Sequence, residues 1–395
     1  MKSAVIVDIA RTPSGKGKPG GALSGVHPTT LLAGLLKEVA SRNHLDMAQI
    51  DDVITGCVSQ IGDQSMNIGR LAVLAAGFPE TVPATTIDRQ CGSSQQAAHF
   101  AAQGVMAGAY EIVIACGVES MSRVPMGSSA QGGDPLVGPL KGRYPTPLVS
   151  QGVSAELIAA KWELSRTELD TFSARSHQLA AANAQWFQDE IVGVDTVDPH
   201  GKRLRHLVDE TVRPQTTVEK LATLKSAFEQ PATKDRFPQI DWRITSGNSS
   251  PLTDGASAVL IISEEMATKL NLTPLARFHS FAVVGSDPLY MLTGVLPATQ
   301  KVLAKAGLRI GDIDAFEVNE AFAPVPLFWQ KVLQVDPERV NPRGGAIALG
   351  HPLGGSGTRL LTTLVHHLQS TGGRYGLQTM CEGGGMANAT VIERL

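Results

Sequence analysis

The chain has 395 residues, with 34 Lys and Arg against 37 Asp and Glu, so its net charge is −3, and 5% of its residues are aromatic. This balance argues against the basic surface of a nucleic-acid-binding protein, and the few aromatic rings argue against a stacking platform for single strands. The 43% hydrophobic content and the 40 glycines are typical of a tightly packed globular protein with two or three domains, or one large compound fold.

Short apolar runs alternate with helical patterns along the chain. In chain order, these patterns predict a strand at 3–9, a helix at 29–43, a strand at 111–117, a helix at 166–187, strands at 257–263 and 314–318, a helix at 358–368, and a closing pair of strands within 375–395. Continuous apolar strands between helices indicate a mainly buried sheet, so we expect a fold of the α/β class.

The middle of the chain differs from both ends, because residues 121–245 hold few strand signals and much of the proline, glutamine and charge. We therefore expect an N-terminal half at 1–120 (completed by 246–270), an inserted loop domain at 121–245, and a C-terminal half at 271–395. Residues 90–118 and 343–385 match each other best, which suggests a duplicated unit.

Four cysteines, Cys57, Cys91, Cys116 and Cys381, are spread over the chain without a CxxC pair. This pattern argues against a disulfide framework and against a structural zinc site. We expect reduced thiols in a cytoplasmic protein. The N-terminus lacks a signal-peptide core, and no apolar run reaches the ~20 residues that span a bilayer. We expect no membrane partner.

Cys91 lies in the segment DRQCGSSQQ, directly before an alanine-rich helical pattern. Free N–H groups and the helix dipole at a helix start lower the pKa of a thiol and favour a nucleophilic thiolate. The alternative is a buried inert cysteine, which is common. Both interpretations remain open on this segment alone.

His351 lies in GGAIALGHPLGGSG, which has six glycines in fourteen positions. The segment lacks the Lys-Ser/Thr pair of a phosphate-binding P-loop, so its glycines indicate close approach of the backbone to another ligand. His351 is then a candidate base, and a structural histidine is the alternative. Residues 15–20 match GxGxxG but do not open a helix, so we expect no dinucleotide site there.

Two further segments carry polar groups at the ends of predicted strands. Asn319 follows the strand at 314–318, at the carboxyl end where α/β sites tend to lie, and a plain helix N-cap is the alternative. Cys381 precedes Glu382 and three glycines that begin at Gly383. Such glycines leave backbone N–H groups free to face an oxyanion, and a tight turn is the alternative.

Taken together, the segments DRQCGSSQQ, NEAFA, GGAIALGHPLGGSG and CEGGG, in this order, resemble the thiolase family over essentially the whole chain. The resemblance implies the thiolase fold, a five-layered αβαβα arrangement of two similar halves with an inserted loop domain. It also implies an acyltransferase of 3-ketoacyl-CoA metabolism that works by ping-pong through a covalent acyl-enzyme.

The resemblance assigns a role to each motif. Cys91 would be the nucleophile, His351 would activate it, and Cys381 would move the proton at the α-carbon of the acetyl unit. Asn319 would hold a water that forms one oxyanion hole with His351. The backbone N–H groups of Cys91 and Gly383 would form the other.

Positions that bind CoA in the family carry over less directly. They fall on Arg213, Ala227, Phe228, Ser250, Met291, Ala321 and Phe322. Arg213 would meet the nucleotide end, and the apolar residues would line the pantetheine tunnel. The resemblance implies no metal or redox cofactor. CoA and acyl-CoA would be the small-molecule partners of a homodimer or homotetramer.

Two departures from familiar short-chain members disfavour acetoacetyl-CoA as the natural substrate. Gln151 stands where those members carry Met at the acyl pocket, and the chain is longer around 231–243, beside the expected CoA entrance. The sequence as a whole most resembles degradative thiolases, including bacterial ones that act on bulky ring-derived acyl groups. We therefore expect thiolytic cleavage of a 3-ketoacyl-CoA to acetyl-CoA and a shortened acyl-CoA.

Three alternatives stay open. One is a biosynthetic acetyl-CoA C-acetyltransferase that forms acetoacetyl-CoA with the same residues. Another is a catalytically silent acyl-CoA-binding protein, which the intact motifs disfavour. The third is a papain-like Cys/His/Asn hydrolase, which the second motif cysteine and the missing secretory context disfavour.

Overall fold

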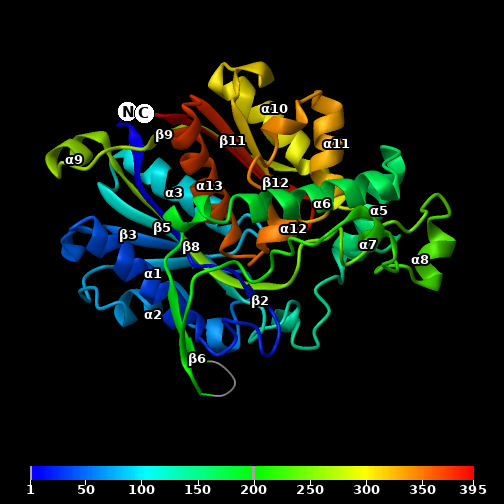
Figure 1. Ribbon diagram of the computed structural model, residues 1–395, viewed down its shortest axis with the longest axis horizontal. Helices are drawn as coiled ribbons and strands as arrows, with labels where there is room; N and C mark the ends of the chain where they lie inside the picture. Colours follow the sequence, from blue (N-terminus) through cyan, green and yellow to red (C-terminus); the bar gives the residue numbers. More distant parts are fainter. Residues whose placement is uncertain (1, 198–200) are drawn as a thin grey trace.

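The computed structural model describes residues 2–197 and 201–395 (Figure 1). Ten strands of this part form one mixed sheet with the order β10-β11-β12-β9-β1-β8-β5-β3-β4, and β2 pairs with β8. The strands are β1 (Ala4–Arg11), β2 (Gly15–Lys16), β3 (Asp52–Gly56), β4 (Ala84–Ile87), β5 (Ile112–Ser120), β8 (Thr253–Ser263), β9 (Ala276–Gly285), β10 (Ala315–Val318), β11 (Tyr375–Glu382) and β12 (Met386–Arg394). All the strands predicted from the sequence are present.

Helices cover this sheet in layers. They are α1 (Pro28–Arg42), α2 (Ile68–Ala75), α3 (Ser93–Ala107), α9 (Glu264–Lys269), α10 (Val295–Ala306), α11 (Pro324–Leu333), α12 (Ala346–Leu349) and α13 (Ser356–Thr371). Helices α3 and α13 pack on each other between the two halves of the sheet, α1 and α2 pack on β3, β4, β5 and β8, and α10 packs on β9, β11 and β12. This is the expected αβαβα order of five layers.

The two halves of the sheet are continuous through a short junction between β1 and β9. Only Val5 with Arg277 and Ile6 with Ala276 pair there, both antiparallel. A single hydrogen-bonded path therefore links the two sheet layers at one edge. In Figure 1 the blue and cyan elements of the first half lie beside the orange and red elements of the second.

Each half repeats the same connections. Parallel β3 and β5 in the first half correspond to parallel β10 and β11 in the second, and each pair continues into two antiparallel strands, β8 and β1 or β12 and β9. In the chain, α3 directly precedes β5 in the first half, and α13 directly precedes β11 in the second. The best-matched stretches of the sequence, 90–118 and 343–385, hold these two helix–strand units.

Small residues allow the central layer to be thin. Ala97, Ala98, Ala101 and Ala102 of α3 are all buried. A Cβ on Gly357 in the first turn of α13 would lie 2.1 Å from the backbone nitrogen of Gln95. The openings of the two central helices therefore touch through their backbones, which only glycine permits at that position. This contact brings the Cys91 segment and the His351 segment together.

The region between β5 and β8 contains α4 (Pro139–Arg143), α5 (Gln151–Lys161), α6 (Arg166–Ala182), α7 (Val218–Ala222) and α8 (Pro231–Arg236). The ribbon of β6 (Val194–Val197) and β7 (Arg203–His206) projects from the body (Figure 1) and was missed, because its short, largely exposed strands carry little hydrophobic pattern. Helix α6 ends at Ala182, before the predicted 187. The division at 121–245 stays a prediction. No described helix is long and apolar enough to cross a membrane.

Candidate active site

Cys91 lies at the opening of α3, in the loop that follows β4. Gln90 before it has a left-handed backbone, with φ of 49°, and Gly92 after it is the N-cap of the helix. Such a strained turn is typical of functional sites. The backbone N–H groups of Cys91 and Gly383 and the side chain of Gln151 all form hydrogen bonds with the thiol.

The structure corrects one expectation for Cys91. Its side chain is only 3% exposed, and burial raises the pKa of the thiol to about 12. The charge of Glu382 acts in the same direction, and the donors around the sulfur only partly offset both effects. The helix-start argument considered the dipole without desolvation, which is larger here. Cys91 is therefore a thiol at neutral pH and needs a base.

Cys381 lies next to last in β11 and is fully buried. Burial raises the pKa of its thiol well above the usual range, and the nearby Cys91 and Glu382 raise it further. The turn after Glu382 requires glycine, since φ is 82° at Gly384 and 80° at Gly385. The two interpretations of this glycine segment therefore describe one feature. The tight turn contains Gly383, whose N–H group hydrogen-bonds with the Cys91 sulfur.

The hydrogen bonds of His351 define its tautomer. Ser356 donates its hydroxyl proton to the carbonyl of Pro352 at 2.8 Å, and its oxygen lies 2.5 Å from Nδ1 of His351. Nδ1 must therefore carry the proton, which leaves Nε2 free to accept one. Burial, assisted by the charge of Arg359, lowers the pKa of His351 to about 3. The imidazole is neutral at pH 7 and can act as a base.

Asn319 points its amide at this free nitrogen. Nδ2 of Asn319 lies 3.4 Å from Nε2 of His351, and its Oδ1 has no partner among residues 2–197 and 201–395. The helix that follows, α11, begins at Pro324 with Ala323 as its N-cap. The N-cap alternative for Asn319 is therefore wrong, and its side chain belongs to the site.

The two groups of motifs meet in one buried region. Cys91 neighbours Cys381 and Gly383, and His351 neighbours Asn319. Leu353, two residues after His351, packs with Cys91 in the same hydrophobic cluster. The structure thus brings together the five residues that the sequence marked as catalytic.

Most of the predicted CoA-binding positions gather near this region. Met291, Ala321, Phe322 and the partly buried Phe228 share one hydrophobic cluster, in which the rings of Phe228 and Phe322 lie 5.9 Å apart. Ser250 donates from its backbone and its hydroxyl to the carbonyl of Ala321 at 3.0 and 3.1 Å.

Of the two remaining positions, Ala227 borders that cluster. It is exposed, directly precedes Phe228, and its N–H donates to the carbonyl of Ile244, a buried member of the cluster, at 2.8 Å. Arg213 is exposed and borders a separate groove of about 480 Å³ that is also lined by Lys220, Ser246 and Gly247. The groove offers two cations and an open face, which suits a phosphorylated nucleotide end.

Several polar residues that hold the site were missed. Glu119 at the end of β5 accepts from the backbone N–H groups of Val58, Ser59 and Gly354 and from Nε2 of Gln64, at 2.8 to 3.1 Å. Thr253 accepts from the N–H of His351 at 3.0 Å. These partners are separated by 55 to 235 positions in the sequence. No local pattern could have identified them.

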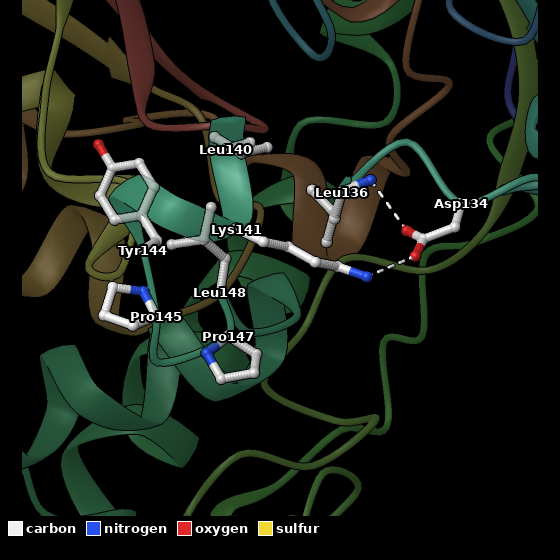
Figure 2. Close-up of a pocket in the computed structure, with 8 residues that line it drawn as sticks. All are labelled: Asp134, Leu136, Leu140, Lys141, Tyr144, Pro145, Pro147 and Leu148. Atoms are coloured by element: carbon white, nitrogen blue, oxygen red, sulfur yellow. Dashed lines mark hydrogen bonds and ion pairs between the residues drawn. The ribbon is translucent and has the colours of Figure 1, made fainter. Parts of the chain in front are cut away.

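A second hollow lies on the segment that leads to α5 (Figure 2). It encloses about 350 Å³ and is lined by Asp134, Leu136, Leu140, Lys141, Tyr144, Pro145, Pro147 and Leu148. Asp134 accepts from the N–H of Leu136 and from Nζ of Lys141, both at 2.9 Å. None of the predicted site residues lines this hollow.

The arrangement has the parts of a covalent acyl-transfer enzyme. One thiol sits among hydrogen-bond donors, a second thiol lies beside it, and a neutral imidazole has a free nitrogen in the same region. Such groups can serve as a nucleophile, an acid and a base, together with N–H groups that can stabilise an oxyanion. Among the described residues, no group of three or more His, Cys, Asp or Glu side chains could hold a metal ion.

Comparison with known proteins gives the family. Residues 4–265 match the model of the thiolase N-terminal domain, and residues 272–394 match that of the thiolase C-terminal domain. The chain is 46% identical to the steroid 3-ketoacyl-CoA thiolase FadA6 of Mycobacterium tuberculosis, over 100% of this chain and 95% of that protein. It is 44% identical to the 3-ketoacyl-CoA thiolase of Aeromonas salmonicida over the full length of both.

A solved structure has the same fold over the whole chain. The acetyl-CoA acetyltransferase of Bacillus anthracis superposes with a TM-score of 0.89 at 36% identity, over 100% of this chain and 99% of that one. The chain belongs to the thiolase family. It has the thiolase fold and is an acyltransferase.

Proposed function

We propose that this thiolase cleaves a 3-ketoacyl-CoA with free CoA, giving acetyl-CoA and an acyl-CoA shortened by the acetyl unit. The observation that carries the proposal is the surrounding of the Cys91 sulfur. The N–H groups of Cys91 and Gly383 and the second thiol, Cys381, all lie at this sulfur. The names of the relatives from Mycobacterium tuberculosis and Aeromonas salmonicida support the degradative direction.

The first half-reaction forms the acyl-enzyme. His351 accepts the Cys91 proton on Nε2, and the sulfur attacks the 3-oxo carbon of the substrate. The bond between carbons 2 and 3 then breaks, and its electron pair leaves as the enolate of acetyl-CoA. Cys381 gives its proton to the enolate carbon, so that acetyl-CoA departs while the shortened acyl group stays on Cys91.

The second half-reaction restores the enzyme. Free CoA passes its thiol proton to the Cys381 thiolate, and its sulfur attacks the thioester carbon on Cys91. The Cys91 sulfur leaves and recovers the proton from His351. All protons and thiols return to their starting places, which gives ping-pong kinetics.

Two groups of donors stabilise the oxygens that become negative. The N–H groups of Cys91 and Gly383 face the Cys91 sulfur, so they suit the oxygen of the acyl group bound there. Asn319 has an unpartnered Oδ1 beside His351. It would hold a water that, with His351, meets the thioester oxygen of the acetyl unit.

We assign CoA to the cluster and groove described above. Arg213, with Lys220 in the same groove, would meet the phosphates of the nucleotide end. Phe228, Met291, Ala321 and Phe322 would line the path of the pantetheine arm, together with Ala227 and Ser250. The thiols and the imidazole supply the acid, base and nucleophile, so we propose that no cofactor besides the co-substrate CoA takes part.

Gln151 and the long segment at 231–243 are the candidate determinants of the acyl group. Gln151 opens α5 and hydrogen-bonds with the Cys91 thiol, so its amide borders any acyl chain on that sulfur. Phe237, Ile240 and Trp242 of the long segment are buried against Val153 and Leu157 of α5. The extra residues thus brace the helix that carries Gln151.

A thiolysis panel tests the proposal. Purified protein is given CoA and 3-ketoacyl-CoAs from acetoacetyl-CoA to long and ring-bearing chains, and acetyl-CoA is followed by mass spectrometry. We expect long or bulky chains to exceed acetoacetyl-CoA in kcat/KM by about tenfold, or about 1.4 kcal/mol. We expect Gln151→Met to reduce that preference. Reaction with acetoacetyl-CoA alone would instead favour a biosynthetic acetyltransferase, the activity named for the Bacillus anthracis neighbour.

The pH dependence of acylation tests the role of His351. A base must be unprotonated to act, and burial lowers the pKa of His351 to about 3. The acylation rate should therefore show no decline centred near the ordinary histidine value of about 6.5. A decline with that midpoint would contradict the assignment.

We further propose a cytoplasmic homodimer or homotetramer. The four cysteines are free and buried, which suits a reducing compartment. Exposed apolar side chains such as Met66, Phe100 and Met126 are available for contact with a second copy. Light scattering on the purified protein measures the assembly directly.

A further inference from the structure

Glu382 is a buried carboxyl of the active site to which the proposed chemistry gives no task. It ends β11, between Cys381 and Gly383, and is fully buried. Neither of its carboxyl oxygens has a hydrogen-bond partner in the described parts of the chain. An ionised carboxylate without donors is strongly disfavoured in such a place.

The carboxyl lies against the opening of α3. A Cβ on Gly92 would lie 2.1 Å from Oε1 of Glu382 and 2.9 Å from both Nδ2 and Oδ1 of Asn388. Asn388, on β12, donates from Nδ2 to the carbonyl of Gly92 at 3.2 Å, and its Oδ1 has no partner within the described ranges. Three unsatisfied acceptor oxygens thus gather at the residue after Cys91, and a proton on Glu382 would supply the donor they lack.

The charged and titratable groups around Glu382 are Asp88 and Arg89 in the loop before α3, Cys91 at its opening, and Cys381 on β11. Burial raises the pKa of Glu382 to about 8, with Arg89 opposing and Asp88 adding to the shift. Nη1 of Arg89 lies 3.9 Å from the sulfur of Met386. In its charged form, Glu382 raises the pKa of both thiols.

We propose that Glu382 is a positioning residue for Cys91: its protonated carboxyl donates to Oδ1 of Asn388 beside the Cα of Gly92. This contact holds the turn in which the N–H groups of Cys91 and Gly383 face the sulfur. Ionisation of Glu382 breaks the contact and places a negative charge where the thiolate must form, so acylation declines at alkaline pH. The inference rests on the proposed function, since it concerns acylation of Cys91.

The experiment measures one half-reaction. Wild type, Glu382→Ala and Glu382→Gln are mixed with the shortened acyl-CoA that thiolysis of the preferred 3-ketoacyl-CoA yields, quenched at short times and weighed intact, from about pH 6 to about pH 9.5. A saturated acyl-CoA carries no free thiol, so no thiol of the substrate titrates in this range. Thermal melts at each pH verify that every variant is folded.

We expect Glu382→Ala to acylate at least about tenfold more slowly at neutral pH. Glu382→Gln, whose amide can donate to Asn388 at every pH, should restore most of that rate. It should also lack the alkaline decline of the wild type. This combination of rescue and a changed pH profile would not arise from a merely space-filling residue.

Two results would overturn the inference. One is acylation of Glu382→Ala at the wild-type rate. The other is an alkaline limb in Glu382→Gln that superimposes on that of the wild type. Absence of an acyl-enzyme in the wild type itself would instead contradict the proposed function, so the two failures are distinguishable.

Discussion

The two halves of the molecule each place a buried glutamate at the same point of the fold, but the two carboxyls differ in their hydrogen-bond donors. Counted from the first residue of the preceding helix, Ser93 or Ser356, Glu119 and Glu382 both lie 26 positions further on. Each carboxyl lies at the helix opening of the other half. Glu119 accepts from the N–H of Gly354 before α13, and Glu382 lies against Gly92 before α3.

The surroundings of the two carboxyls differ in their donors. Each oxygen of Glu119 accepts two N–H groups, which favours the carboxylate although burial raises its pKa. Glu382 has no donor among the described residues. At the end of β5, the hydrogen-bonded carboxyl of Glu119 thus supports the loop that carries His351. At the matching end of β11, the carboxyl of Glu382 lies without described donors beside the sulfurs of Cys91 and Cys381. The end of β11 is where we propose that the chemistry takes place.

The largest expected effect is the loss of turnover when Cys91, at the opening of α3, is replaced. Cys91→Ala leaves the framework intact but removes the nucleophile, so we expect turnover to fall by at least about 10⁴-fold and no acyl adduct to form. Intact mass after incubation with an acyl-CoA measures this. Cys116→Ala, a buried thiol on β5 that hydrogen-bonds with Thr55, is the matched control and should still acylate. An adduct on Cys91→Ala would refute the assignment.

Next in size is the difference between the two thiols of the site. Cys381→Ser should still acylate Cys91 from an acyl-CoA, although more slowly than the wild type, because the departing CoA thiolate depends less on the Cys381 proton than the enolate carbon does. Cleavage of a 3-ketoacyl-CoA should fall by at least about 10²-fold, because the enolate carbon loses its proton donor. The two half-reactions are measured separately by mass spectrometry. Normal cleavage by Cys381→Ser would remove Cys381 from the mechanism.

The comparison of the two glutamates has its own test. Glu119→Gln points an amide NH₂ group at N–H donors, so we expect a loss of about 2–3 kcal/mol in the free energy of unfolding. Glu382→Gln replaces a protonated carboxyl with a neutral isostere and should lose less than about 1 kcal/mol. Urea denaturation at neutral pH gives both values. Equal losses would mean that the two carboxyls do not differ in protonation.

A smaller effect is expected from the long segment. Ile240→Ala removes apolar contact with Val153 and Leu157 on α5, so Gln151 at the start of that helix is held less firmly. We expect KM for the 3-ketoacyl-CoA or CoA to rise by about threefold, with the rate of acylation within about twofold of the wild type. Lys234→Ala, in the exposed helix α8 of the same segment, is the control. Unchanged Michaelis constants would leave the segment without a role in substrate binding.

Much of the framework and of the site could be predicted from the sequence. Buried strands such as β5 and β8 are apolar over their length, and the glycine-rich segments around His351 and Cys381 mark places where backbones meet. The resemblance of four ordered segments is the source of the roles that we propose for Cys91 and Asn319. These features lie within short stretches, so a local pattern is enough to find them.

The remainder depends on contacts that no short stretch contains. The pKa of Cys91 follows from burial by the assembled site rather than from its place at a helix start. Glu119 finds its donors in three distant segments, and only the fold shows that Glu382 has no donor among the residues that the structure describes. Length alone indicated the extra segment, but only the fold shows that Ile240 and Trp242 pack on α5.

The most direct test of the central claim is to mix the protein with a 3-ketoacyl-CoA in the absence of free CoA. One equivalent of acetyl-CoA should be released, and peptide mapping should find the shortened acyl group on Cys91. Addition of CoA should then release that group as acyl-CoA. Release of acetyl-CoA without a labelled Cys91, or an acyl group on Cys381 instead, would contradict the mechanism.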